Sequence, residues 1–434
     1  MNPLARQLNE TISREHPHLA GMLSRLGQAI YFPKVGILSQ TAEARQKANV
    51  HNATIGIATE NGKPMHLDVI HERLSAFDPK DLYDYAPPAG KPELRKLWRE
   101  KLIRENPSLA GKTIGMPIVT NALTHGLSIV ADLFADEGDA LVLPDKSWEN
   151  YELTFGVRRG ARIVNYPLYD ANWKFNAAGL RDALLAQKDH GKAIALLNFP
   201  NNPTGYTPGP AEADAIVEAI LDAAETGVNV VAVTDDAYFG LFFEDSVRES
   251  LFGRLCGLHE RVFPIKVDGA TKEEYVWGFR VGFVTYGGVS EACLDALEQK
   301  TLGIIRATIS SGPHPSQTFV LEALKSPDFD RQRAEKYEIL KRRAVRVKQL
   351  LDSGKYGNEW TYYPFNSGYF MCLKLLTADA ETVRRRLLDA YGVGTIALGP
   401  TDLRVAFSCI EEDKIEDLFD RIHQAVLDVK AVRA

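Results

Sequence analysis

The sequence has few cysteines and no long apolar run, and these absences exclude several classes of protein. Its four cysteines are scattered over 434 residues, and none forms a CxxC pair. This usage suits a reducing compartment and indicates neither a disulfide framework nor a zinc site. No run is long enough to cross a bilayer, and the first residues, MNPLARQLNETISREHPH, lack an apolar signal core. We therefore expect a cytoplasmic protein without a metal site and without a membrane partner.

The sequence also lacks an excess of positive charge. Its formal net charge of −6 argues against a general nucleic-acid binder. The basic run KRRAVRVK at 341–348 falls in a long charged helical pattern, where a solvated face is the ordinary explanation. No helix-turn-helix or winged-helix module precedes the main pattern. We therefore expect no nucleic-acid partner.

An alternation of helical and strand patterns begins near residue 66. Apolar runs bounded by turn residues predict strands, and amphipathic segments between them predict helices. This order is typical of βα units, and it predicts an α/β protein with a mostly parallel seven-stranded sheet between helices. The expected strands are 117–120, 140–144, 161–168, 193–199, 228–235, 261–268 and 277–286.

The pattern changes after the last of these strands. Three helices are expected, at about 289–304, 313–325 and 328–353, and short strands with a final helix follow. This shift predicts a second, smaller α+β domain. Residues 1–65 are predicted to form an N-terminal arm and the first part of the small domain. Residues 66–330 are predicted to form the large domain, and residues 331–434 the rest of the small domain.

The stretch DGATKEEYVWGFRVGF, at 268–283, contains a lysine in a small polar turn and an arginine in a strand-like run. A lysine used in chemistry must lose its proton, and burial or a neighbouring cation lowers its pKa from about 10.4. A neutral amine at Lys272 can bond to an aldehyde cofactor, of which pyridoxal phosphate is the common one. Arg280 would then match the cofactor phosphate, and Gly278 and Gly282 would let other groups approach the backbone closely. Taken alone, the same stretch also suits a surface lysine followed by a core strand.

Unusual residues follow two of the expected strands, where open sheets bind ligands. The loop NFPNNPTGYTP follows strand 193–199, and its prolines, asparagines and glycine predict a rigid irregular loop. The sequence TDDAYFG follows strand 228–235. An aspartate here could cap the next helix, or a buried carboxylate could keep a pyridine nitrogen protonated. Tyr238 could donate to the phenolic oxygen of the same cofactor.

Together, NNPTG, DDAY, and TK with an arginine eight residues later resemble the class I and II aminotransferases, which are pyridoxal phosphate enzymes of the aspartate aminotransferase fold. The resemblance covers nearly the whole chain and implies a homodimer of fold type I with shared active sites. It implies that Lys272 carries the cofactor and acts in catalysis with Asp235 and Tyr238. Asp235, rather than Asp236, fits the aspartate three residues before the tyrosine.

The resemblance also implies the remaining binding residues. TNALTHG at 120–126 resembles the phosphate loop at a helix start. The implied cofactor contacts are Ala122, Leu123, Thr124 and Arg280 at the phosphate, Thr271 with a hydroxyl beside Lys272, Trp148, Asn202, Asp235 and Tyr238 at the ring, and Tyr85 from the neighbouring subunit. The implied substrate contacts are Arg404 and Gly56 at the α-carboxylate, Asn202 and Trp148 beside it, and Arg306.

Two positions depart from the family pattern. Gly269 stands where the family often has a serine that contacts phosphate, and Tyr151 stands where the family usually has a histidine, three residues after the stacking aromatic. These departures affect cofactor affinity and tuning more than the chemistry.

The resemblance predicts transfer of an amino group between an L-amino acid and a 2-oxo acid. Arg306 occupies the place of an arginine that binds the substrate's side-chain carboxylate, which predicts a dicarboxylate pair: aspartate or glutamate with 2-oxoglutarate. Arg306 could instead make a structural contact at the dimer interface. These motifs also fit three alternatives. One is transfer from aromatic or apolar amino acids, another is lyase or decarboxylase chemistry on the same fold, and the third is a regulator that only senses an effector. Such regulators carry a DNA-binding domain ahead of this fold, and the sequence offers none.

Overall fold

The computed structural model describes residues 1–15, 23, 28–29, 36–54, 56–72 and 77–433. Helix α1 covers Pro3–Glu15. No described helix is both long enough and apolar enough to pass through a membrane.

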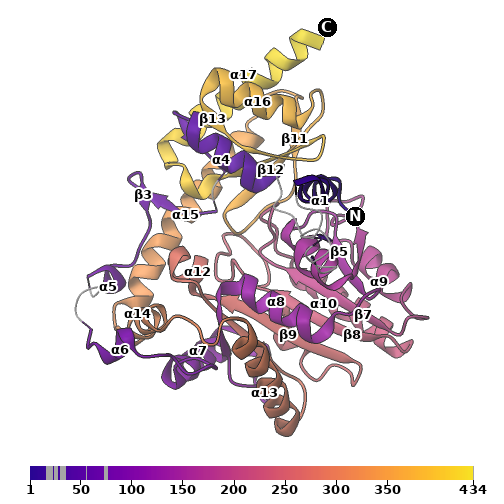
Figure 1. Ribbon diagram of the computed structural model, residues 1–434. Helices are drawn as coiled ribbons and strands as arrows, with labels where there is room; N and C mark the ends of the chain where they lie inside the picture. Colours follow the sequence, from indigo (N-terminus) through magenta and orange to yellow (C-terminus); the bar gives the residue numbers. More distant parts are fainter. Residues whose placement is uncertain (16–22, 24–27, 30–35, 55, 73–76, 434) are drawn as a thin grey trace.

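A seven-stranded sheet forms the centre of the larger part of the molecule (Figure 1). Its strand order is β4-β10-β9-β8-β7-β5-β6, with β10 antiparallel to both neighbours and the other pairs parallel. The prediction of a mostly parallel seven-stranded α/β sheet is confirmed. The bounds are β4 Ile118–Asn121, β5 Ala140–Pro144, β6 Arg162–Tyr166, β7 Lys192–Asn198, β8 Asn229–Asp235, β9 Val262–Gly269 and β10 Val281–Tyr286.

The two faces of this sheet pack against different helices. Side chains alternate between the faces along each strand, so Val231 of β8 joins one core cluster and Ala232 the other. Helix α8 (Ala122–Phe134) packs in the first cluster, and helices α9 (Ala177–Leu185) and α10 (Pro210–Glu225) pack in the second. Because both faces are covered, the central strands are apolar on both sides.

One expected strand begins later than predicted. Residues Trp277–Phe279 form a short 3₁₀ turn, and β10 starts at Val281. Arg280 lies between them with φ 57° and ψ 47°, in the left-handed region. The prediction that Arg280 lies inside a strand is therefore wrong, because the chain makes a sharp turn at this residue before it enters the sheet.

A second, antiparallel sheet has the strand order β11-β12-β15-β14, with bounds Trp360–Tyr362, Phe370–Leu375, Asp402–Ala406 and Ile396–Leu398. It lies in the upper part of Figure 1 with the C-terminal helices. These are α16 (Ala380–Tyr391) and α17 (Ile415–Arg433). Further α-helices among the described residues are α5 Asp68–His71, α6 Lys80–Tyr83, α7 Pro92–Glu105, α11 Leu251–Leu255, α12 Ala270–Glu273, α13 Glu291–Thr308, α14 His314–Lys325 and α15 Phe329–Asp352.

An N-terminal segment packs against this C-terminal part, as Figure 1 shows for helix α4 (Ile37–Lys47). Strand β1 (His51–Asn52) pairs in parallel with β13 (Val393–Gly394). Strands β2 (Thr59–Glu60) and β3 (Lys63–Pro64) then form a small hairpin. These contacts agree with the expectation that the N-terminal segment forms part of the small domain. The domain boundaries at residues 65 and 330 stay a prediction.

Candidate active site

A cavity of about 410 Å³ lies where strands of the large sheet end. Strands β7 and β8 end at Asn198 and Asp235, which are paired in register, and both residues line the cavity. The carboxyl ends of neighbouring parallel strands meet at one edge of a sheet, and ligands bind beyond that edge. The position of the cavity is therefore a consequence of the strand order.

Eleven of the residues predicted for the site line this cavity: Gly56, Leu123, Thr124, Trp148, Asn202, Asp235, Tyr238, Thr271, Lys272, Arg280 and Arg404. Ala122 is the buried neighbour of Leu123, and its backbone N–H donates to the carbonyl of Arg280 at 2.9 Å. Tyr85 and Arg306 do not line the cavity of their own chain. Tyr85 is 93% exposed, and Arg306 donates to Ser310 Oγ at 2.6 Å.

Lys272 lies on the one-turn helix α12, with its Nζ 5.0 Å from the centre of the Tyr238 ring. Burial lowers the pKa of Lys272 to about 8, the charge of Arg280 adds to this effect, and the carboxylate of Asp235 opposes it. Near neutral pH this amine loses its proton far more readily than a free lysine does. The two causes expected from the sequence, burial and a neighbouring cation, both operate here.

Adjacent aspartates at the end of β8 have different surroundings. Asp235 accepts hydrogen bonds from Tyr151 Oη at 2.6 Å and from the backbone N–H of Ala237 at 3.2 Å. Burial raises the pKa of Asp235, and the bond from Tyr151 opposes that rise. Asp236 instead pairs with buried Lys266 and accepts from Ser250 Oγ at 2.6 Å. The structure thus places the carboxylate of Asp235, and not that of Asp236, in the cavity.

The start of helix α8 offers an anion site at another wall of the cavity. Its first-turn N–H groups have no intrahelical partner, and Arg280 lies beside them because its carbonyl binds Ala122. A Cβ at Gly282 would come within 2.6 Å of the Ala122 carbonyl carbon, so only glycine permits this approach, whereas a Cβ at Gly278 would meet open space. The close approach expected at both glycines is therefore found at Gly282 alone. Thr271 Oγ1 is buried with no hydrogen-bond partner among the described residues.

A network of amide side chains connects the strand ends. Asn198 donates through Nδ2 to the carbonyl of Asp235 at 2.9 Å and accepts through Oδ1 from the backbone N–H of Asn202, also at 2.9 Å. Asn202 in turn accepts from Arg404 at 3.0 Å. Asn198 thus fixes the loop that carries Asn202 relative to the aspartate.

Arg404 lies on β15 of the second sheet and is only 2% exposed. Its guanidinium donates to Asn202 Oδ1 at 3.0 Å and to the carbonyl of Thr54 at 3.1 Å, and it lies 4.3 Å from the centre of the Phe370 ring. Within the described residues, its buried Nε has no hydrogen-bond partner. Burial lowers the pKa of Arg404. A guanidinium held by neutral groups is suited to bind a carboxylate.

Several residues that line the cavity were not predicted to do so. They are Tyr151, Asn198 and Ala237 near Asp235, Thr54, the apolar residues Ile57, Trp277 and Phe370, and three residues of helix α4: Ile37, Thr41 and Arg45. Tyr151 was noticeable in the sequence only as a departure from the family pattern. Nothing in the local sequence of α4 indicates that it reaches this cavity.

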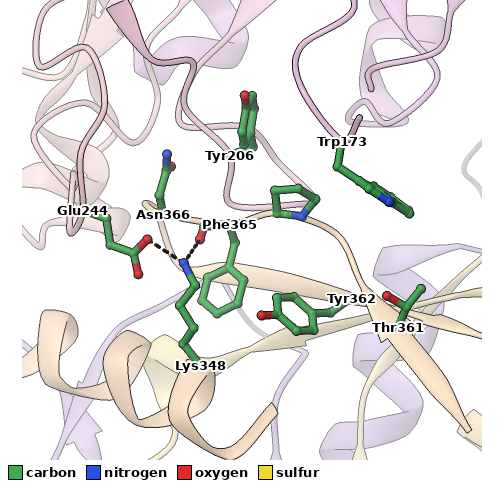
Figure 2. A pocket seen from close by; sticks show the side chains of 9 residues that line it. Trp173, Tyr206, Glu244, Lys348, Thr361, Tyr362, Phe365 and Asn366 are labelled. Carbon is green, nitrogen blue, oxygen red and sulfur yellow. Dashed lines mark hydrogen bonds and ion pairs between the residues drawn. The ribbon is translucent and has the colours of Figure 1, made fainter. Parts of the chain in front are cut away.

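A second hollow, of about 470 Å³, is larger but has a different character (Figure 2). Its cation, Lys348, is already paired with Glu244 at 2.5 Å and donates to the carbonyl of Phe365 at 3.4 Å. Its lining residues are Trp173, Tyr206, Glu244, Lys348, Thr361, Tyr362, Pro364, Phe365 and Asn366. None of them belongs to the predicted site, so the smaller cavity is the candidate active site.

Residues 56–422 match the family described as aminotransferase class I and II. The chain belongs to this family. A curated relative, the probable aspartate/prephenate aminotransferase of Aquifex aeolicus, is 27% identical over 360 residues, which cover 80% of this chain and 84% of the relative. The resemblance inferred from the sequence motifs is confirmed.

Solved structures of aminotransferases share the fold. An aminotransferase from Anaerococcus prevotii superposes with a TM-score of 0.81 at 23% identity and covers 91% of this chain and 97% of its own. The α-aminoadipate aminotransferase of Thermus thermophilus, complexed with N-(5'-phosphopyridoxyl)-L-leucine, superposes with a TM-score of 0.75 at 20% identity, over 95% of this chain and 99% of its own. The protein is a pyridoxal phosphate-dependent transaminase.

The residues of the cavity fit this cofactor. A phosphate group needs donors and positive charge, which the first turn of α8, the buried hydroxyl of Thr271 and Arg280 supply together. A protonated pyridine nitrogen needs a carboxylate, and Asp235 supplies one. An aldehyde needs an amine of lowered pKa, and Lys272 has one. The individual contacts to the cofactor stay predictions.

Proposed function

We propose that this aminotransferase acts on a dicarboxylate pair, with glutamate and 2-oxoglutarate as one half. The charge of the cavity carries the proposal. Its lining includes four cationic side chains, those of Arg45, Lys272, Arg280 and Arg404, and one carboxylate, that of Asp235. A phosphate and a single substrate carboxylate leave part of this positive charge without an anion, and a second substrate carboxylate would complement it. The Aquifex relative is a probable aspartate/prephenate aminotransferase, which agrees with such a substrate.

We assign the steps of the reaction to residues that line the cavity. Pyridoxal phosphate, when bound, supplies an aldehyde and a ring that takes up the electron pair released at the substrate Cα. Lys272 would hold the cofactor through its amine and, once the substrate amine has taken its place, would move a proton away from the substrate Cα. Asp235, whose carboxylate Tyr151 fixes, would keep the ring nitrogen of the cofactor protonated. Arg404 orients the substrate through its α-carboxylate.

A homodimer with shared active sites is part of the same proposal. Tyr85 is 93% exposed in a single chain, and Arg306 is exposed on α13. Both side chains are therefore available to a neighbouring subunit. The sequence resemblance places Tyr85 at the neighbour's cofactor phosphate and Arg306 at the neighbour's substrate.

The test of the substrate class is a panel of amino donors with 2-oxoglutarate as acceptor. We expect kcat/KM for aspartate or glutamate to exceed that for alanine, leucine and phenylalanine, with 2-oxo acid and pyridoxamine phosphate as products of the half-reaction. A preference for apolar or aromatic donors would refute the dicarboxylate proposal. Release of carbon dioxide or ammonia in place of pyridoxamine phosphate formation would instead indicate decarboxylase or lyase chemistry.

A further inference from the structure

One face of helix α4 forms part of the cavity wall. Ile37, Thr41 and Arg45 all line the cavity, and their spacing of four residues places them on one side of the helix. An arginine side chain on a helix leans toward the helix N-terminus. Arg45 and Thr41 therefore lie next to each other on the side of α4 that forms the cavity wall.

Helix α4 is fixed from two sides. Its first backbone N–H, at Ile37, donates to Glu149 Oε1 at 3.2 Å, next to the cavity residue Trp148. Its buried Gln40 exchanges two hydrogen bonds with the backbone of Ala397 in β14, at 2.7 and 3.0 Å. These contacts set the rotation of the helix, so the orientation of its cavity face does not depend on Arg45 itself.

Arg45 differs from the other charged residues of this helix. Glu43 pairs with Arg384 at 2.9 Å and with Lys47 at 3.3 Å, and Lys47 also pairs with Asp389 at 3.0 Å. Arg45 makes neither a hydrogen bond nor an ion pair within the part of the chain that the structure describes. Arg45 is thus a cation of α4 that lines the cavity. No carboxylate of the described residues pairs with it.

The cations of the cavity can be matched with the anions that an aminotransferase binds. Arg280 lies beside the start of helix α8 and suits the cofactor phosphate, while Arg404 suits the substrate α-carboxylate. Lys272 suits the cofactor aldehyde and has Asp235 as its neighbouring carboxylate. Arg45 is then the cation of the cavity without an assigned anion. We propose that Arg45 binds the side-chain carboxylate of a dicarboxylic substrate and so sets the substrate preference, an inference that rests on the proposed function.

This proposal assigns the side-chain carboxylate to a residue of the same chain. The sequence resemblance assigns that carboxylate to Arg306 of a neighbouring subunit. In its own chain Arg306 lies outside the cavity and bonds to Ser310, whereas Arg45 already lines the cavity. The two assignments predict different effects of substitution, and they can be separated.

The experiment uses the holoenzyme and the variants Arg45→Gln, Arg306→Gln and Lys47→Gln. Lys47 is the matched control, because it is a cation of the same helix that does not line the cavity. Calorimetric titration with glutarate and with butyrate measures binding of an inert dicarboxylate and an inert monocarboxylate without turnover. The ratio of kcat/KM for glutamate to that for alanine measures the preference during reaction.

We expect Arg45→Gln to weaken glutarate binding by roughly 10- to 100-fold, as for loss of a charge-assisted hydrogen bond, with a much smaller change for butyrate. The glutamate-to-alanine ratio should fall by a similar factor, and Lys47→Gln should leave both measurements at the wild-type values. The assignment to Arg45 would be overturned if Arg45→Gln left glutarate binding intact and Arg306→Gln removed it. That result would leave the dicarboxylate function in place. Equal losses for glutarate and butyrate in Arg45→Gln would also overturn it. Wild-type enzyme without preference for dicarboxylates would refute the proposed substrate class itself.

Discussion

Substituting the two adjacent aspartates at the end of β8 should produce opposite defects. Asp235→Asn removes the carboxylate that lines the cavity, and Asp236→Asn removes the partner of a buried lysine. We expect the first variant to lose activity while it keeps its stability, and the second to lose stability while its folded fraction keeps most of its activity.

The expected loss of stability in Asp236→Asn follows from the surroundings of Lys266. This lysine is 1% exposed, and without Asp236 its nearest carboxylate is Asp268, at 3.5 Å. Removing one partner of a buried ion pair costs about 3–5 kcal/mol, and Asp268 favours the lower end of that range. The midpoint of thermal unfolding should therefore fall by several degrees. Replacing both partners, as Asp236→Asn with Lys266→Met, should recover much of this loss because no unpaired charge then remains.

The expected defect of Asp235→Asn is a loss of activity. A preorganised charge directed at the reacting system is worth on the order of 10²–10³ in kcat, so a loss of that size is expected for this variant. Its folding cost should be small, because burial already raises the pKa of Asp235 and the charge of Asp236 adds to that rise. An uncharged amide relieves both effects.

Two assays separate these effects. Thermal unfolding of the cofactor-free variants reports stability, and single-turnover formation of pyridoxamine phosphate, normalised to bound cofactor, reports the chemistry. Equal activity losses in the two variants, or a larger loss in Asp236→Asn, would refute the assignment of Asp235 to the ring nitrogen. Unchanged stability in Asp236→Asn would show that the Lys266 pair contributes little.

Three further predictions concern Lys272 and the dimer. Lys272→Ala should fold and lose catalysis, and borohydride reduction of the wild type should attach the cofactor to the peptide that contains Lys272; attachment at Lys266 or Lys300 would contradict the assignment. Because the pKa of Lys272 is lowered to about 8, its amine is protonated below that pH and neutral above it, so the rate at which apoenzyme takes up the cofactor should rise through pH 8 and then level off. A stopped-flow rate that still increases toward pH 10 would argue against the lowered pKa. Mixing Tyr85→Ala and Lys272→Ala chains should restore some activity, since one hybrid site would carry neither change; no recovery despite proven subunit exchange would indicate self-contained sites.

The sheet and its catalytic edge could be predicted from the sequence because each depends on local patterns. Parallel strands covered on both faces are apolar on both faces, which made 228–235 recognisable, and β8 is found at Asn229–Asp235. The residues that follow such strands meet at one edge, so the sequence alone was enough to place Asp235 and the loop around Asn202 together.

The turn at Arg280 could not be predicted from local pattern. The run WGFRVGFVTY is apolar enough to suit a strand throughout, yet the chain turns at Arg280 with φ 57°. Contacts with a segment far away in the sequence accompany this conformation: Ala122 bonds to the Arg280 carbonyl at 2.9 Å and packs against Gly282. Such a contact has no signature within a ten-residue window.

Helix α4 shows the same limit over a longer range. It reaches the cavity because the N-terminal segment packs on the C-terminal part, through the pairing of β1 with β13 and the bonds between Gln40 and Ala397. Neither partner reveals the other in the sequence. The hydrogen bond from Tyr151 to Asp235 spans 84 residues in the same way, and it gives the aspartate a neutral donor where the family usually has a histidine.

The surroundings of Arg404 explain how a buried cation can remain available for a substrate. Burying a guanidinium is costly unless its donors are satisfied, and here Asn202, the carbonyl of Thr54 and the ring face of Phe370 satisfy it in part. All three partners are neutral, so they hold the side chain in place without cancelling its charge. An aspartate at position 202 would stabilise Arg404 more strongly and would compete with the substrate carboxylate. Asn202→Asp should therefore raise KM for every amino donor, because its carboxylate would occupy the donors that the α-carboxylate needs, and an unchanged KM would show that Arg404 does not bind that group.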